Sequence, residues 1–363
     1  MYMDLFTAVV PEEQLHQNFK RIYNSPNHKS QRKLLQDWAN HFQDRDGKFV
    51  KEFQTTFNSS FWELYLHALF REYGFEIDMS RETPDFLISR QNQTVVVEAT
   101  IANNPEHGTP EWEESVYDAL GIGDAPVKTD DYDFTQFNME SIIRFSNSIS
   151  AKYQKYQKKY KELTHVKGKP FVIALSAFHH PLRGLSADVP IRALLYDYYV
   201  DEQELKKHPE LYPDGRPPTK YLGEVRKKDG ASILLGLFND ECMKEVSAVI
   251  FSSLATMGKV DALCAFDSSI PEKCFFSGIR LKNSQVMPFF FEKSQYEESI
   301  MDGLQIYHNP YAQYPIRDDF FKADGVAQCM GFMNEAQTFL AYENYDDLLM
   351  ARNVMRFVEK RSE

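Results

Sequence analysis

The sequence predicts an α/β protein with a mixed β-sheet, and three segments carry this prediction. Residues 77–100 have the pattern of two strands joined by a turn, and residues 139–163 repeat an apolar side chain every three or four positions. Residues 170–178 are almost unbroken in apolar character. These patterns are typical of paired strands, of an amphipathic helix and of a strand buried on both faces. Together they favour an α/β core with a mixed sheet.

The remaining segments are predicted to surround this core, which spans residues 58–180 and begins with a helix over 60–73. Residues 1–57 have amphipathic helical pieces and form an N-terminal helical region. Residues 101–137 combine proline, glycine and acidic residues, so they are expected to form a long irregular crossover. Residues 181–230 are polar and rich in turn formers, which predicts an insertion with a helix near 191–200.

The C-terminal part, residues 231–363, is predicted to be an α+β region. Short apolar and aromatic runs indicate strands, and the last part of the chain is predicted to be helical. The expected strands are 231–238, 247–253, 274–281 and 287–293, and the expected terminal helix lies near 345–360.

Composition and charge limit the class of protein. The chain has 363 residues, of which 43% are hydrophobic, so it can bury a large core in one elaborated domain or in two. Its net charge of -12 argues against a protein that coats nucleic acid without specificity. The charge is segregated, because residues 140–169 hold eight Lys or Arg against two Glu. A nuclease with a locally basic binding face is compatible with this distribution.

No run of about 20 apolar residues is present, so the sequence predicts no transmembrane helix. The first residues lack a basic segment before their short apolar run, which argues against a signal peptide. We therefore expect a cytoplasmic protein with no membrane partner. The four cysteines share no CxxC spacing and are expected to be reduced thiols rather than zinc ligands; they are Cys242, Cys264, Cys274 and Cys329.

Two carboxylates in the strand-rich segment are the strongest candidates for chemistry. Asp85 and Glu98 are separated by twelve residues, enough for two short strands and a turn that return Glu98 alongside Asp85. Because strand side chains alternate, Glu98 and Thr100 share one face. Two adjacent carboxylates repel each other unless a cation lies between them, and Mg²⁺ prefers oxygen ligands. We interpret the pair as a divalent-metal site; the alternative is that Asp85 only shapes a turn.

A third carboxylate, Glu63, allows two interpretations. Ser60 and Glu63 match the capping box, in which the glutamate bonds back to the start of its helix. The same position would also let Glu63 face the metal site, where it would bind the ion directly or through water. The sequence leaves both open.

These residues resemble the PD-(D/E)xK nuclease superfamily, which has the restriction-endonuclease-like fold. The resemblance covers roughly residues 60–180. It includes the helix ending in Tyr-Gly-Phe at 73–75, the Pro84-Asp85 pair, the Glu-Ala-Thr segment at 98–100, and the helix and buried strand that follow. It implies an αβββαβ core with a mixed sheet, to which an N-terminal helical extension and C-terminal α+β additions are attached.

The resemblance also implies a function. Asp85 and Glu98 would be ligands to Mg²⁺ or Mn²⁺, with Glu63 as the helix acid found in many members. The protein would be an endodeoxyribonuclease that hydrolyses phosphodiester bonds, with DNA favoured over RNA as its partner, and it could act as a homodimer.

Thr100 departs from the family pattern, because a lysine is expected at its position. That lysine is thought to orient the attacking water and to offset charge on the phosphorane. Lys152, on the helix predicted over 139–163, is the candidate replacement, since its stem could follow the core surface to the sheet. Lys155 and the later lysines of this helix are expected to form a solvated basic face. The alternative function is a non-catalytic nucleic-acid-binding or regulatory protein of the same fold, for which Thr100 is the best argument.

Other polar residues carry less weight. His107, His179 and His180 are expected to be loop or surface residues, and Lys259 is a weaker candidate for a phosphate contact. No nucleotide-binding glycine motif, lipase-type GxSxG or zinc-protease HExxH is present. A third possibility is an unrelated α/β protein in which Asp85 and Glu98 lie far apart.

Overall fold

The structure is a computed structural model of the whole chain. It describes residues 3–104, 134–184, 188–265, 272–283, 285–334, 337–343 and 347–358. Most of the crossover predicted over 101–137, including His107, lies outside these described residues. No helix among them is long and apolar enough to cross a membrane.

An eight-stranded mixed sheet forms the centre of the molecule, with the order β1-β2-β3-β4-β9-β12-β13-β14. β1, β2 and β3 pair antiparallel, β3, β4 and β9 run parallel, and β9 pairs antiparallel with β12. β12 and β13 are parallel, and β14 closes the edge antiparallel. The predicted α/β class with a mixed sheet is confirmed. The strands are Glu76–Asp78, Phe86–Arg90, Gln93–Ala102, Phe171–Ala177, Val246–Ser252, Leu304–His308, Val326–Asn334 and Gln337–Glu343.

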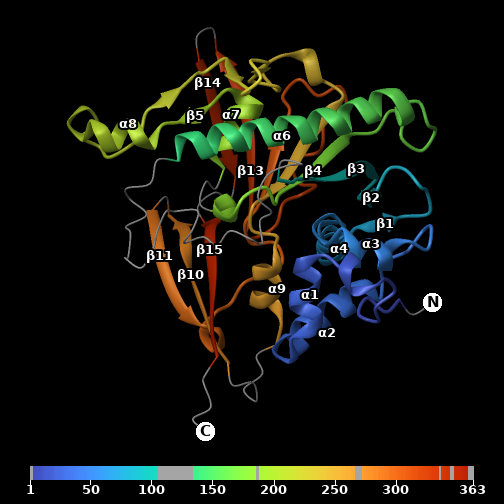
Figure 1. The fold of residues 1–363 in the computed structure, drawn as a ribbon. Coiled ribbons are helices and arrows are strands. Elements are labelled where there is room, and N and C mark those ends of the chain that lie inside the picture. Colours follow the sequence, from blue (N-terminus) through green and yellow to red (C-terminus); the bar gives the residue numbers. More distant parts are fainter. Residues whose placement is uncertain are drawn as a thin grey trace.

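Helices cover both faces of this sheet (Figure 1). On one face the N-terminal helices share a core with side chains such as Val97 and Ala99 of β3. These helices are α1 Gln17–Asn24, α2 Lys29–Ala39, α3 Phe49–Thr55 and α4 Phe57–Glu72. On the other face, α6 Thr135–Lys155 and α7 Val189–Tyr196 pack on residues such as Val96. The apolar stripe predicted for 139–163 faces this second core from Ile142 to Tyr160, whereas Leu163 at its end is exposed.

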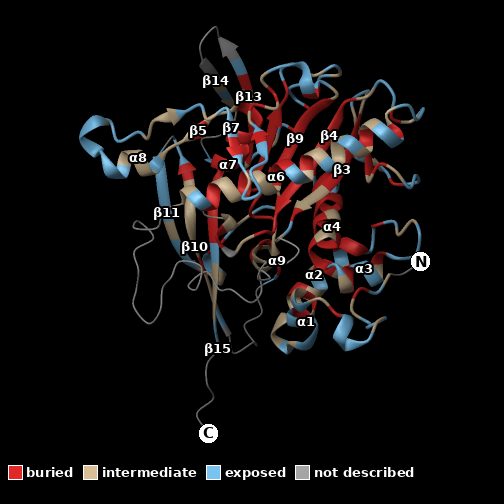
Figure 2. Ribbon diagram, turned by 45° about the horizontal axis from the view of Figure 1, so that its top comes forward, coloured by how far each residue is buried: buried red, intermediate tan, exposed pale blue. Residues whose placement is uncertain are grey.

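In this part of the chain the described elements include α4, β1, β2, β3, α6 and β4 in that order, and the first of the two strands expected over residues 77–100 is divided into β1 and β2. Every residue of β4 and of β9 is buried, as expected for parallel strands covered on both faces (Figure 2). The helix expected near 191–200 is α7, and the strand expected at 247–253 is β9. The run at 231–238 forms only the short strand β8, Ser232–Leu234, which pairs with β7, Glu224–Arg226.

A second sheet has the order β11-β10-β15, with β10 Glu272–Lys282, β11 Gln285–Glu292 and β15 Leu349–Val358. The predicted terminal helix near 345–360 is therefore wrong. Local sequence there allowed a helix, but the segment pairs along its length with β10, and long-range pairing of this kind overrides local propensity. The strands expected at 274–281 and 287–293 correspond to β10 and β11.

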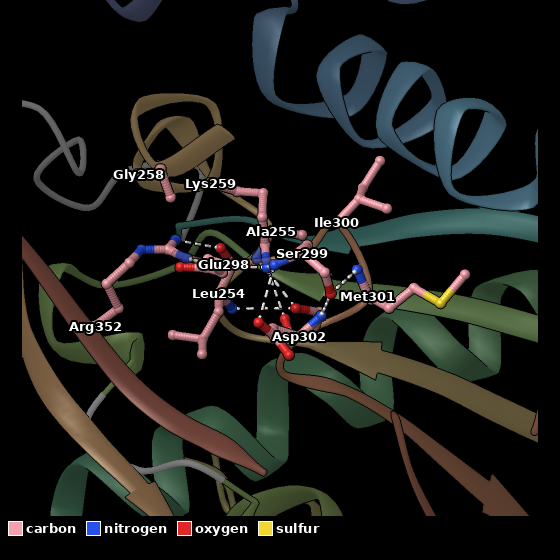
Figure 3. A network of polar contacts seen from close by, with 12 residues as sticks. Leu254, Ala255, Gly258, Lys259, Glu298, Ser299, Ile300, Met301, Asp302 and Arg352 are labelled. Carbon is pink, nitrogen blue, oxygen red and sulfur yellow. Dashed lines mark hydrogen bonds and ion pairs between the residues drawn. The ribbon is translucent and has the colours of Figure 1, made fainter. Parts of the chain in front are cut away.

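A buried polar network joins this second sheet to the main core (Figure 3). Lys259, in α9 (Met257–Leu263), forms an ion pair with Glu298 and donates to the carbonyl oxygens of Ser299 at 3.0 Å and Asp302 at 2.7 Å. Arg352 of β15 lies 2.5 Å from Glu298. The side chains of Lys259 and Glu298 are fully buried. Lys259 is thus a buried ion-pair partner, and its burial counts against it as a candidate for a phosphate contact.

Candidate functional site

The β2–β3 hairpin brings the two predicted carboxylates together. Phe86 pairs with Val97 in the antiparallel register, so the residue before Phe86, Asp85, lies opposite the residue after Val97, Glu98. The Ala99 N–H donates to Asp85 Oδ2 at 2.7 Å and ties the aspartate to β3. Glu98 is fully buried on the face that α6 covers. An unrelated protein with distant chance carboxylates does not fit this geometry.

Two lysines of α6 meet these carboxylates. Lys152 Nζ lies 3.0 Å from Glu98 Oε1 and 4.0 Å from Asp85 Oδ2. Lys155 Nζ lies 2.5 Å from the same Glu98 oxygen. One turn earlier, the Ser148 hydroxyl donates to the Ile101 carbonyl at 3.1 Å and holds α6 against β3. The structure therefore brings Lys152 to the place predicted for it.

The interpretation of Lys155 as part of a solvated face is wrong, because its side chain is 33% exposed and bonds to Glu98. Residues three apart on a helix share one face, so the spacing from Lys152 to Lys155 was the signal that could have found it. After Lys155 the helix continues as a π-helical turn, η4, over Tyr156–Tyr160. The buried Tyr160 ring lies 5.6 Å from the Lys155 ammonium, and burial and the charge of Glu98 raise the pKa of its hydroxyl.

Opposing effects set the charges in this cluster. Burial alone would raise the pKa of Glu98, but the charges of Lys152 and Lys155 and their hydrogen bonds outweigh it and hold that pKa below its usual range. Burial and then the charge of Glu98 raise the pKa of Asp85. Burial would lower the pKa of Lys152, yet the two carboxylates raise it, so its ammonium stays charged.

Glu63 lies on the wall of a neighbouring cavity of about 420 Å³ that Asp85 also lines. The capping-box interpretation is wrong, because α4 begins at Phe57 and Ser60 is inside the helix. Packing of the N-terminal helices extends α4 by a turn beyond the start that the local motif suggested. Burial, and then the charge of Asp85, raise the pKa of Glu63 to about 8. The carboxyl is therefore largely protonated at neutral pH.

Two other sequence candidates are Thr100, on the same strand as Glu98, and His179. Thr100 is partly buried on β3 and pairs in register with Leu175 of β4. His179 is buried, with Nε2 2.8 Å from the Ser141 hydroxyl, and its ring stacks on Phe137. Burial lowers the pKa of His179 to about 3, so it is a neutral core histidine, and its assignment to a polar surface loop is wrong.

The site offers carboxylate oxygens, which are the ligands that a divalent cation such as Mg²⁺ prefers. One nitrogen, Lys152 Nζ, lies 4.0 Å from Asp85 Oδ2 and 3.0 Å from Glu98 Oε1, so the two carboxylates share one cationic partner. Glu98 Oε2 is buried and has no hydrogen-bond partner of normal geometry in the described part of the chain, although the Tyr160 hydroxyl interacts with this carboxylate. Within that part no three acidic, histidine or cysteine side chains form a complete metal cage. Two carboxylates are what Mg²⁺ commonly takes from a protein, so Glu63 remains only a predicted additional ligand.

Comparison of the chain with protein-family models, curated proteins and solved structures gives no match. The function is therefore inferred from the geometry of the site.

Proposed function

We propose that this protein is a Mg²⁺-dependent nuclease that hydrolyses phosphodiester bonds, with Mn²⁺ as an alternative metal. The observation that carries the proposal is the convergence of Asp85, Glu98 and Lys152 from a hairpin and the helix that follows it. The order α4, β1, β2, β3, α6, β4 supports the proposed αβββαβ core of the restriction-endonuclease-like fold. In this proposal Lys152 replaces the lysine missing at Thr100.

The roles of the residues follow from their contacts. Asp85 and Glu98 would hold the metal, which when bound activates a water and polarises the phosphate. The Ala99 N–H fixes one oxygen of Asp85. Lys152 keeps its charge beside Glu98 and offsets negative charge that develops on the phosphate. Lys155 holds Glu98 from the more exposed side.

The charge distribution around the site indicates how a nucleic acid would approach. Lys158 and Lys159 are exposed on η4, beyond Lys155, and exposed lysines position phosphate backbones without reading sequence. The cavity on the other side of Asp85 has more acidic than basic residues on its wall, with Glu52 and Glu82 among the acidic ones, and this excess of negative charge repels phosphate. We therefore place the backbone along the end of α6. DNA remains the proposed substrate, and a cytoplasmic location and a homodimer remain proposals with it.

The second candidate function is a non-catalytic nucleic-acid-binding or regulatory protein of the same fold. Two observations favour it: Thr100 is neutral, and Lys152 and Lys155 already neutralise Glu98 as a structural ion-pair cluster would. In such a protein the carboxylates would serve folding rather than metal binding.

One experiment separates the candidates. Purified protein is incubated with Mg²⁺ or Mn²⁺ and with plasmid, linear and single-stranded DNA and RNA, beside the Asp85→Ala variant. The proposal expects cleavage that EDTA and Asp85→Ala both abolish. Cleavage of none of these substrates would remove the catalytic claim. No cleavage together with no Mn²⁺ binding in the unaltered protein would favour the binding protein.

A further inference from the structure

Arg45 connects the N-terminal region to the carboxylate site. It lies between α2 and α3, and its side chain is 19% exposed. Its Nη1 donates to the carbonyl oxygens of Arg81 at 2.8 Å and Pro84 at 3.0 Å, with longer contacts of 3.4 Å to those of Glu82 and Asp85. Nη2 lies 3.9 Å from Asp85 Oδ1. One guanidinium therefore contacts both the backbone and the carboxylate of the segment that presents Asp85.

This segment lacks the support of a strand ladder. β1 ends at Asp78 and β2 begins at Phe86, so residues 79–85 form the connection between them. Backbone carbonyls in such a connection need donors from elsewhere. Arg45 supplies them from one side, and His165 Nε2 donates to the Thr83 carbonyl at 2.8 Å from the other. The place of Asp85 thus depends on two side chains that are distant in sequence.

We propose that Arg45 is a positioning residue that holds Asp85 in the orientation required to share a metal ion with Glu98. This inference rests on the proposed function. A planar guanidinium directs several donors in a rigid fork, whereas a lysine ammonium is a compact charge on a flexible stem. The N-terminal helical region would then be part of the catalytic unit, because the site is incomplete without Arg45.

A matched control is available in the same region. Arg32 Nη1 also donates to two backbone carbonyls, those of Ile22 at 2.6 Å and Ser25 at 2.7 Å. These contacts lie within the N-terminal helices. Arg32→Ala therefore shows how much the protein changes when arginine–carbonyl hydrogen bonds are lost in this region. Arg45→Ala shows the same effect together with any effect on Asp85.

The test compares Arg45→Ala, Arg45→Lys and Arg32→Ala with the unaltered full chain. Cleavage is measured against Mg²⁺ concentration, and amide hydrogen exchange is followed over residues 79–86. Residues that orient metal ligands typically change metal affinity or activity by about 10–100-fold. For Arg45→Ala we expect the half-saturating Mg²⁺ concentration to rise at least about tenfold, with KM for DNA unchanged and faster exchange over 79–86. In Arg45→Lys the Mg²⁺ requirement and the exchange rate should lie between those of the unaltered protein and those of Arg45→Ala. Arg32→Ala should change neither the Mg²⁺ requirement nor the exchange rate over 79–86.

Three results would overturn the inference. The first is an unchanged Mg²⁺ requirement and exchange rate in Arg45→Ala. The second is a rise in the Mg²⁺ requirement in Arg32→Ala that equals the rise in Arg45→Ala. The third is an Arg45→Lys variant with the Mg²⁺ requirement of the unaltered protein. If the unaltered protein cleaves nothing, the proposed function fails by itself. The exchange experiment needs no activity, so it still decides whether Arg45 holds the segment that carries Asp85.

Discussion

Lys152 Nζ lies 3.0 Å from Glu98 Oε1, although 54 residues separate the two in the sequence. Glu98 is on a central strand and Lys152 near the end of the helix that crosses it. The contact puts a charged ammonium between two carboxylates in a largely buried place. This arrangement leads to predictions about activity, metal binding and stability.

Lys152→Ala should lower kcat by about 100-fold or more, because the positive charge nearest the proposed metal position is lost. Folding should be kept, since Lys155 still pairs with Glu98. Single-turnover cleavage and circular dichroism measure the two properties, and Lys159→Ala, which removes an exposed lysine, is the control. Full activity in Lys152→Ala would exclude Lys152 from the mechanism.

Thr100→Lys tests whether the lysine has moved. Thr100 and Glu98 are two residues apart on β3, so their side chains share a face of the sheet. Introduced into Lys152→Ala, a lysine at position 100 should raise the cleavage rate by roughly tenfold over that single variant, because charge returns to the site. The rates of both variants are compared at saturating Mg²⁺. No recovery in a well-folded double variant would argue that the two positions are not interchangeable.

Asp85→Asn should abolish Mn²⁺ binding without lowering the free energy of unfolding. Burial and Glu98 raise the pKa of Asp85, so the site disfavours its ionised form, and a neutral amide removes that penalty. The amide oxygen can still accept the Ala99 N–H. Calorimetric titration with Mn²⁺ and urea unfolding in EDTA check both parts. Retained Mn²⁺ affinity would count against Asp85 as a ligand.

Glu63 should make stability depend on pH. Its pKa in the folded protein is about 8, above the ordinary 4.5, so between these values the folded state holds a proton that the unfolded state has lost. The contribution of Glu63 to the free energy of unfolding should therefore be fully present below pH 4.5. It should fall as pH rises towards 8, by up to about 1.4 kcal/mol per pH unit. Urea unfolding in EDTA from pH 5 to 8 measures this slope. Glu63→Gln should flatten it, and an equal slope in the variant would contradict the assignment.

Glu298→Ala should destabilise the protein by about 3–5 kcal/mol, because it leaves Lys259 and Arg352 buried without their shared partner. Asp37→Ala is the matched control, since it removes an exposed ion pair with Lys33 and should cost at most about 1 kcal/mol. Thermal unfolding compares the two. Cleavage per folded molecule should stay unchanged in both variants, and a loss confined to Glu298→Ala would show that the network also supports the site.

Features determined by local pattern were predictable from the sequence. Alternation in the hairpin predicted that Asp85 and Glu98 would meet, and the unbroken apolar run predicted a strand buried on both faces. The helical period of α6 and the missing lysine at Thr100 together pointed to Lys152. Each of these follows from the fixed geometry of strands and helices, so a short stretch of sequence is enough.

Features that depend on what packs against a segment were not predictable. The residues of β15 are a strand because β10 lies beside them, and Lys259 is an internal ion-pair partner because β15 brings Arg352 to Glu298. Lys155 was predicted to be solvated, and the sequence did not single out Arg45. Whether a charged side chain is solvated or paired is decided by its surroundings, and those surroundings come from residues far away in the chain.

The sequence by itself determined the α/β class and the pairing of the two carboxylates on one hairpin, since both follow from short-range periodicity and spacing. The tertiary structure alone decided which cations meet those carboxylates. Lys155 and Arg45 approach from opposite sides, one from α6 and one from the N-terminal helices. Electrostatic interactions act through space rather than along the chain, so the charge balance of the site existed only once the chain had folded.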